Sequence, residues 1–475
     1  MSLALKIILV INALIIVYFL LVNGTYLLHN LIALGAIRRY NFTRAITDYE
    51  RPFYSTFYKP VSIIVPAFNE EKTIVETVRS VLSLRYPEFE VVVVNDGSSD
   101  GTLESIKMAF ALWETDETFD YDIPCEEIRA VYRSDEHPNL KVVDKENGGK
   151  GDALNAGVNV SSFPLFCNID ADSVIDAWSL LQIVKPFVED HRVQAAGGVV
   201  RVANECDIEG GEVRDIRLSR KWLVRFQTVE YLRAFLFGRL GWSSLQTLMI
   251  ISGAFGIFRR SAVVEVGGYR TDTVGEDMEL VLRMHRMMCS RGKDYRFTFL
   301  ADPVCWTQVP EDLASLSRQR RRWQRGLGES LAMNRGMMLN PRYKWVGMLG
   351  FPFFFLFELL SPVIELTGYL IFVVSLILGA LNLPFVIAFL VSAILLGILL
   401  SVSSIFLEEI SFHKYPRLRD VLTLCGFAVL ENFGYRQLTA WWRLRGLIEL
   451  LFRRRGWGKA KRRHFKSVRE AEAVR

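Results

Sequence analysis

The sequence predicts an α/β protein whose mostly parallel sheet is flanked by transmembrane and interfacial helices. Three observations lead to this fold class. The 475 residues are 51% hydrophobic, which is high for a chain that lies wholly in water. Apolar runs long enough to cross a bilayer occur at the N-terminus and in the last third of the chain. Between them, short β-branched runs alternate with amphipathic helical segments, and such alternation builds parallel sheets.

Four parts follow from this pattern. We expect an N-terminal transmembrane helix in residues 1–40, a cytoplasmic α/β domain in 41–335, interfacial and transmembrane helices in 336–452, and a basic cytoplasmic tail in 453–475.

Composition excludes several classes of function. A net charge of +5 is small for this length, and the basic residues gather at the edges of the apolar segments, so a general nucleic-acid binder is disfavoured. The six cysteines are scattered, without a C-x-x-C pair or a nearby histidine, which predicts free thiols rather than a zinc site. Neither a G-x-G-x-x-G turn after the first strand nor a P-loop occurs, which disfavours dinucleotide binding and ATP hydrolysis.

The first element is an almost continuous apolar run from Leu3 to Val22. A signal peptide is the alternative, but the run is too long and no clear small-residue cleavage site follows it. We therefore predict a retained transmembrane helix. Arg38, Arg39 and Arg44 follow it, and this basic flank predicts that the N-terminus lies outside and the next domain in the cytoplasm.

The α/β domain begins with two β-branched runs, Val61–Pro66 and Glu90–Asn95, separated by a helical segment from Glu71 to Leu84. This is a βαβ unit, in which ligands bind beyond the carboxyl ends of the strands. The polar residues at those ends are therefore candidate binding residues: Asn69, Glu70 and Asp96.

A glycine-rich turn from Lys145 to Asn155 leads into the next helix. Its glycines would let the backbone approach a phosphate that Lys150 neutralises, although an ordinary turn with a surface lysine has the same pattern. A hydrophobic strand then ends in Asp170 and Asp172. On an extended strand these carboxylates share a face, where both would serve one divalent cation, or one would bind a metal and the other a ribose hydroxyl.

Two further stretches complete the domain. We predict an apolar strand from Ile251 to Phe258, in which Ser252 and Gly253 would let a substrate lie close to the backbone. An amphipathic helix then begins after Gly275 with Glu276 and Asp277. These carboxylates serve either as a helix cap or, for one of them, as a general base near an acceptor hydroxyl.

The segment Gln319–Trp323, Gln-Arg-Arg-Arg-Trp, stands between the acidic motifs and the membrane sequence. Three adjacent arginines are costly to bury unless they face an anion such as a phosphate, and the indole of Trp323 offers a flat face for a sugar ring. A basic helix facing water or lipid headgroups is the alternative.

Membrane sequence follows. We predict an interfacial helix from Trp345 to about Phe357, with part of a span as the alternative, and two crossings, Leu359–Leu381 and Pro384–Leu407. In Val421–Leu451, polar residues that include Glu431 and Asn432 interrupt the apolar pattern. A re-entrant or interfacial arrangement fits better than one span, and at membrane depth the two polar residues would line a path for a polysaccharide; an amphipathic helix on the headgroups is the alternative.

Four motifs in this order resemble those of membrane-integrated family 2 glycosyltransferases, the group of the synthases of cellulose, chitin oligosaccharides, hyaluronan and poly-N-acetylglucosamine. They are Asn95–Ser98, Asp170–Asp172, Gly275–Asp277 and Gln319–Trp323. The resemblance covers about Lys59 to Glu329 by motif. One departure is Gly275, where the family often has threonine.

The resemblance implies a GT-A-type, Rossmann-like nucleotide-sugar domain and a role for each candidate. Asp96, with Asn69, Glu70 and Lys150, would bind the donor's uridine, and Asp170 and Asp172 the ribose and a Mg²⁺ or Mn²⁺ on the diphosphate. Asp277, beside Glu276, would take the acceptor's proton, giving inversion. Gln319 and Arg322 would cover the donor, while Trp323, Ser252 and Gly253 would contact the acceptor glycan.

We therefore predict a processive, inverting glycosyltransferase of a bacterial inner membrane. It would build a β-linked exopolysaccharide from a UDP-sugar, with UDP-N-acetylglucosamine preferred, and pass the product outward. The alternatives are a β-glucan synthase that uses UDP-glucose, transfer of one sugar to a lipid carrier, and a catalytically silent membrane subunit. The expected partners are the donor, the growing glycan and the bilayer, without nucleic acid. The motifs fix neither the donor sugar, the linkage, the oligomeric state nor a need for an accessory membrane subunit.

Overall fold

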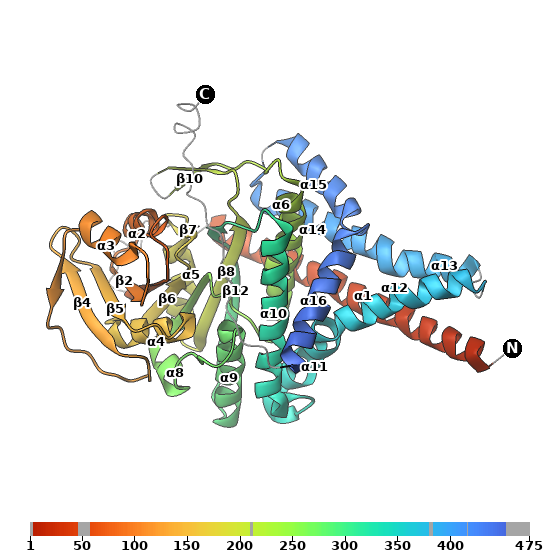
Figure 1. Cartoon of the computed structure of the whole chain (residues 1–475), viewed down its shortest axis with the longest axis horizontal. Coiled ribbons are helices and arrows are strands. Elements are labelled where there is room, and N and C mark those ends of the chain that lie inside the picture. The colour runs from red at the N-terminus through yellow and green to blue at the C-terminus, as the bar shows by residue number, and fades with distance from the viewer. Residues whose placement is uncertain (1–2, 46–57, 210–211, 380–382, 416, 453–475) are drawn as a thin grey trace.

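The computed structural model describes residues 3–45, 58–209, 212–379, 383–415 and 417–452 (Figure 1). A sheet domain forms one side of the molecule, and a group of long helices projects from the other. The predicted basic tail, 453–475, lies outside the described residues.

A ten-stranded mixed sheet organises the soluble domain, in the order β3-β4-β5-β2-β1-β6-β11-β8-β12-β7. All its strands point the same way except β4, β7 and β11, so the predicted mixed, mostly parallel sheet is confirmed. A separate two-stranded sheet pairs β9 with β10. The strands are β1 Val61–Ala67, β2 Phe89–Asp96, β3 Leu112–Thr115, β4 Ile128–Ser134, β5 Leu140–Lys145, β6 Leu165–Ile169, β7 Ser173–Ile175, β8 Val193–Val202, β9 Asp207–Glu209, β10 Glu212–Asp215, β11 Phe255–Arg259 and β12 Arg296–Thr307.

The central strands form because alternate apolar side chains have a core on each face of the sheet. Ile63 and Val93 belong to a cluster with the helices α2 (Ile74–Leu82) and α5 (Ser179–Glu189). Ile64 belongs to a second cluster with α4 (Lys150–Val160) and α9 (Glu276–Ser290). Because both faces are covered, the carboxyl ends of the parallel strands are left as the place for a site.

The other helices of the soluble domain are short, except α10, which carries the Gln-Arg-Arg-Arg-Trp segment. Asp312 caps α10, since its carboxylate accepts a hydrogen bond from the Ser315 N–H at 2.8 Å. These helices are α3 Thr102–Ala109, α6 Trp222–Tyr231, the π-helix η2 Leu232–Gly238, α7 Arg239–Ser244, α8 Arg260–Glu265, α10 Leu313–Met333, and the 3₁₀ turns η3 Arg335–Met337 and η4 Pro341–Tyr343.

Among the described residues, two helical stretches are long and apolar enough to cross a membrane, Val10–Arg39 and Leu383–Phe412. A third, Val346–Leu359 followed by Ser361–Ile377, qualifies as one span only across a bend of 45°. These stretches comprise α1 Leu3–Ala45, the π-helix η5 Val346–Gly350, α11 Phe351–Phe353, the π-helix η6 Phe354–Leu359, α12 Ser361–Ile377, α13 Leu383–Leu390, the π-helix η7 Val391–Leu395 and α14 Leu396–Phe412.

The first helix, Leu3–Ala45, continues well beyond the apolar run that ends at Val22. Asn23 does not stop it, because its side-chain amide donates to the carbonyls of Phe19 and Ser392, each at 3.0 Å. Arg38 and Arg39 therefore lie in the last turns of the helix rather than after it. The segment predicted as an interfacial helix or part of a span forms Val346–Leu359, the first arm of the bent pair, and its placement at the membrane surface stays a prediction.

The segment that follows the second span is a pair of helices, α15 (Leu418–Leu430) and α16 (Tyr435–Leu451). The helix break at Glu431–Gly434 falls where the polar residues interrupt the sequence pattern. α16 packs along α10 (Figure 1). Neither helix is among those long and apolar enough to cross a membrane, and their placement at the membrane surface stays a prediction.

Candidate active site

Polar loops meet at the carboxyl edge of the sheet, as the βαβ pattern predicts. The loop after β1 and the loop after β2 are tied together: the Ser99 N–H donates to Asn69 Oδ1 at 2.8 Å, and the Glu70 N–H donates to Thr102 Oγ1 at 2.9 Å. Asn69 is exposed and has a positive φ of 57°, whereas Glu70 is buried and accepts a bond from the Thr73 hydroxyl at 2.9 Å. These residues therefore shape the edge, and their contact with a donor stays a prediction.

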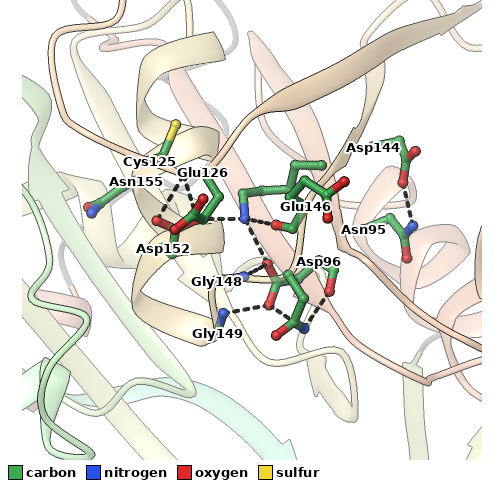
Figure 2. A network of polar contacts seen from close by, with 12 residues as sticks. Asn95, Asp96, Cys125, Glu126, Asp144, Glu146, Gly148, Gly149, Asp152 and Asn155 are labelled. Atoms are coloured by element: carbon green, nitrogen blue, oxygen red, sulfur yellow. Dashed lines mark hydrogen bonds and ion pairs between the residues drawn. The ribbon is translucent and has the colours of Figure 1, made fainter.

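Asp96 holds the glycine-rich turn in place (Figure 2). Its buried carboxylate accepts hydrogen bonds from the backbone N–H groups of Gly148 and Gly149, at 3.0 and 2.8 Å, and from the Asn147 amide at 3.2 Å. Lys145 Nζ lies 2.8 Å from the same carboxylate. Both carboxylate oxygens of Asp96 thus already have partners within the protein. A hydrogen bond from uridine, as predicted, would use an oxygen that also accepts one of these internal bonds.

The same network reaches the first turn of α4. Lys145 is fully buried and bridges Asp96 to Asp152, whose carboxylate lies 2.5 Å from its Nζ. Asp152 also accepts the Glu126 N–H at 3.1 Å. A buried ammonium needs such partners, because an unpaired charge away from water is costly. The turn therefore has one fixed shape before any donor binds.

Five predicted residues converge at the centre of the edge. Lys150 Nζ lies 2.5 Å from Asp170 Oδ1, 4.0 Å from Glu276 Oε1, and donates to the Gly253 carbonyl at 3.2 Å. The Gly253 N–H donates to Asp277 Oδ2 at 3.1 Å. The fold therefore joins the glycine-rich turn, the two-aspartate turn and the start of α9, which are far apart in sequence, into one polar site.

Two local predictions need correction. Asp170 and Asp172 do not share the face of a strand: β6 ends at Ile169, and both carboxylates stand in the turn before β7, where the Ser173 N–H donates to the Asp170 carbonyl at 2.9 Å. Ser252 and Gly253 are likewise in the turn before β11, which begins only at Phe255. In a longer strand these backbone groups would pair with a neighbouring strand. In both places they form hydrogen bonds within a turn or to side chains of the site instead.

The charges in the site act on one another. Burial raises the pKa of Glu276 to about 7, against the opposing charges of Lys150 and Arg322. Burial alone would lower the pKa of Lys150, but the carboxylates of Asp170, Glu276 and Asp277 raise it above its usual value. Lys150 thus stays a cation, and Glu276 is the carboxyl group that changes charge near neutral pH.

The Gln-Arg-Arg-Arg-Trp segment lies on α10 across this site. Arg322 is exposed, and its charge acts on Glu276. Gln319 is half-buried, and its Oε1 has no hydrogen-bond partner in the described part of the chain. Trp323 is half-buried, with its ring 6.1 Å from Phe235 and the Arg320 guanidinium 4.5 Å above it. α10 therefore presents the Arg322 cation to the site on one face and the Trp323 indole to the protein interior on another.

The residues that hold α10 against the start of α9 through hydrogen bonds and close packing were not predicted from the sequence. Glu329 accepts bonds from the Thr273 hydroxyl at 2.8 Å and the Val274 N–H at 2.9 Å. Ser330 donates to the Gly275 carbonyl at 3.1 Å. Gly275 and Gly326 face each other so closely that a Cβ on Gly275 would lie 2.6 Å from the Gly326 carbonyl oxygen. Gly326 is an isolated glycine inside a helical pattern, and such a glycine is the sequence feature that indicates a close packing contact.

A cavity of about 340 Å³ opens between α10 and the membrane helices. Trp323 and Phe235 line it from the soluble side, and Tyr26 of α1 and Glu358 of η6 line it from the helices of the membrane region. Aromatic and charged groups together suit a carbohydrate, whose ring faces are apolar and whose edges carry hydroxyls.

A mixed sheet with a polar site at its carboxyl edge, a two-aspartate turn and a carboxylate at the start of α9 define a glycosyltransferase of the GT-A type. The chain matches the family described as Glycosyl transferase family 2 over residues 62–267 and Glycosyl transferase family group 2 over residues 165–402, which is half of the chain. It therefore belongs to glycosyl transferase family group 2.

Among curated proteins, the chain is similar to poly-beta-1,6-N-acetyl-D-glucosamine synthase of Staphylococcus epidermidis, with 30% identity over 272 residues, and of Staphylococcus aureus, with 32% identity over 276 residues. Each match covers 57% of this chain and 55% of the relative, so the chain spans about half the length of these relatives. Among solved structures, a mannosyltransferase of Pyrobaculum calidifontis in complex with GDP-mannose and Mn²⁺ shares the fold, with a TM-score of 0.53, 17% identity and coverage of 93% of this chain and 100% of that one.

Proposed function

We propose that this protein is a processive, inverting glycosyltransferase that polymerises a β-linked exopolysaccharide from a UDP-sugar, with UDP-N-acetylglucosamine as the preferred donor. The observation that carries the proposal is the convergence of Lys150, Asp170 and Asp277 around the Gly253 backbone, next to a cavity lined by Trp323. The printed activity of the Staphylococcus relatives supports the choice of polymer.

Asp277 is the group best placed to take the proton of an acceptor hydroxyl. Its Oδ2 is fixed by the Gly253 N–H at 3.1 Å, and its Oδ1 accepts the Met278 N–H at 2.8 Å. These two N–H donors fix the position of the carboxylate, as a general base requires. The neighbouring Glu276, whose pKa is near 7, is the alternative base in the same turn of α9.

The leaving group would be a nucleoside diphosphate. Lys150 and Arg322 supply positive charge on its side of the site. Asp170 and Asp172 would hold a Mg²⁺ or Mn²⁺, because two carboxylates from one turn are a usual protein share for a cation whose other ligands are phosphate oxygens and water. Such an ion supplies neutralisation of the charge that develops on the diphosphate.

The polymer would grow into the cavity beneath α10 and then pass outward. With two spans, or three if the bent pair counts as one, the chain has the helices to be an integral protein of a bacterial inner membrane, with its α/β domain in the cytoplasm. The cavity touches α1, η6 and α12 of this membrane part, so a glycan that stacks on Trp323 already lies at its entrance. An accessory membrane subunit would be a further partner.

The test is UDP release by the purified full chain in nanodiscs with Mg²⁺ or Mn²⁺, offered UDP-N-acetylglucosamine, UDP-glucose and UDP-glucuronate separately. We expect high-mass product from UDP-N-acetylglucosamine, and a loss of about 10²- to 10⁴-fold in Asp277→Asn. Asp120→Asn, an exposed aspartate outside the site, is the matched control.

Each other result would overturn a part of the proposal. High-mass product from UDP-glucose alone would replace it by a β-glucan synthase, and a single sugar on an added lipid carrier would replace it by a lipid-linked transferase. No release from any donor, with wild type and Asp277→Asn alike, would leave the silent membrane subunit.

A further inference from the structure

One arginine in the cavity stands apart from the others. Arg239, the first residue of α7, is 7% exposed and lines the cavity, and its Nη1 has no hydrogen-bond partner among the described residues. Its guanidinium is held by aromatic faces, 4.2 Å above the ring of Phe235 and 5.9 Å from that of Phe299. A buried cation with an open donor is costly unless a ligand completes it.

The other arginines of the cavity that lie beside a carboxylate already have their partners. Carboxylates of the protein therefore pair with these charges, whereas no carboxylate among the described residues forms an ion pair with Arg239. These pairs are Arg320 with Glu230 at 2.8 Å, Arg443 with Glu358 at 3.3 Å, and Arg233 with Glu431.

Arg239 also lies toward the reacting end of the cavity. Burial lowers the pKa of Arg239 to about 10, and the charge of Asp277 opposes that shift, so the two groups sense each other. Phe235, which carries the guanidinium, in turn contacts Trp323 at 6.1 Å. Arg239 thus interacts with the charge of the proposed base and contacts, through Phe235, the indole on which the acceptor sugar would stack.

We propose that Arg239 is a specificity residue whose guanidinium donates a hydrogen bond to the acetamido carbonyl oxygen of the acceptor sugar. This inference rests on the proposed function and deepens it, since it names the group on the glycan that the cavity recognises. An amide carbonyl is the strongest neutral acceptor on an N-acetylated sugar, and a guanidinium carries only donors. A glucose unit has only a hydroxyl at that place.

The experiment compares two acceptors with the purified full chain and UDP-N-acetylglucosamine. One is a set of N-acetylglucosamine oligosaccharides, and the other is glucose oligosaccharides of the same linkage and length. A hydrogen bond to a charged donor distinguishes them by about 10- to 100-fold, so the wild-type KM is expected to be lower by that factor for the acetylated acceptor. In Arg239→Gln the two KM values should converge, with the change in KM rather than in kcat and with the KM for the donor unchanged.

Arg259→Gln is the matched control, because Arg259 also lies over a phenylalanine, Phe187 at 5.6 Å, yet is outside the cavity. It should keep the wild-type preference. Arg239→Lys keeps the charge over Phe235 but loses the planar fork, so it should fold and show an intermediate preference.

A wild-type protein that extends both acceptors with equal KM overturns the inference, even if Arg239→Gln does not fold. A loss in Arg239→Gln that is equal for both acceptors also overturns it, since the arginine would then only support the fold. Failure of the proposed function gives a different result: no UDP release by the wild type with any acceptor.

Discussion

The contact between Gly275 and Gly326 gives the sharpest prediction of how the site is assembled. A Cβ added to Gly275 would lie 2.6 Å from the Gly326 carbonyl oxygen and 2.8 Å from its Cα. Both are backbone atoms, so no side-chain rotation relieves the overlap. The start of α9, with Glu276 and Asp277, must move away from α10 in Gly275→Ala.

The size of the effect follows from the distance. Restoring an ordinary contact of 3.4 Å requires a shift of about 0.8 Å. A displacement of about 1 Å in a reacting group costs on the order of 10²-fold in rate, and overpacking of this kind costs about 1–3 kcal/mol of stability. We therefore expect a fall in kcat approaching a hundredfold, with a modest fall in unfolding temperature. Gly275→Thr, which restores the residue frequent in the family, should be worse.

The assay is UDP release together with thermal unfolding of the purified protein. Gly336→Ala is the control, because nothing lies within 4 Å of a Cβ at that position. If Gly275→Ala turned over at the wild-type rate and unfolded at the wild-type temperature, α9 and α10 would not be in backbone contact, and this account of the site would be refuted.

Three further predictions concern charge. First, the pKa of Glu276 is about 7 in the fold against 4.5 in the unfolded chain, so the folded state holds a proton that the unfolded state releases. The free energy of unfolding should therefore fall as pH rises from about 4.5 to 7 and stay low above pH 7. The same pH dependence of unfolding in wild type and Glu276→Gln over this range would contradict this prediction. Second, Arg201 of β8 and Glu408 of α14 form a buried pair at 2.5 Å. Glu408→Ala should cost about 3–5 kcal/mol, and adding Arg201→Met should recover much of it; a denaturant titration that shows no recovery would argue against the pair. Third, Lys145→Met should loosen the glycine-rich turn and raise the donor KM about tenfold with little change in acceptor KM, and an unchanged donor KM in initial-rate kinetics would show that the turn is held without it.

The central sheet and the order of the motifs could be predicted because they depend on local patterns. β1 and β2 end within one residue of their predicted ends, since alternating β-branched residues with two covered faces leave little choice of register. The rule that ligands bind at carboxyl ends predicts that Asn69 and Asp96 lie at one edge of the sheet, whereas the joint site of Asp170 and Asp277 is implied by the family resemblance.

The rest depends on contacts between distant parts of the chain. The partner of Asn23 in α1 is the carbonyl of Ser392, and no local pattern reveals this contact between two distant helices. The carboxylate of Asp96 looks free for uridine in the sequence, but the fold brings Gly148 and Gly149 to it. The nearness of Gly275 to Gly326 likewise appears only when two helices pack.

α10 accounts for the union of a soluble site and membrane helices in one chain. Glu329 bonds to the loop before α9 at one end of this helix, and Trp323 faces the cavity. In between, Gln324 donates to the Leu359 carbonyl at 2.9 Å, where the bent membrane helix breaks. One helix thus sets the distance from the proposed base, Asp277, to Trp323 and from Trp323 to the membrane helices. A polymer that advances by one sugar must keep its end at the base, and a fixed distance between these three points is the simplest way to meet that requirement.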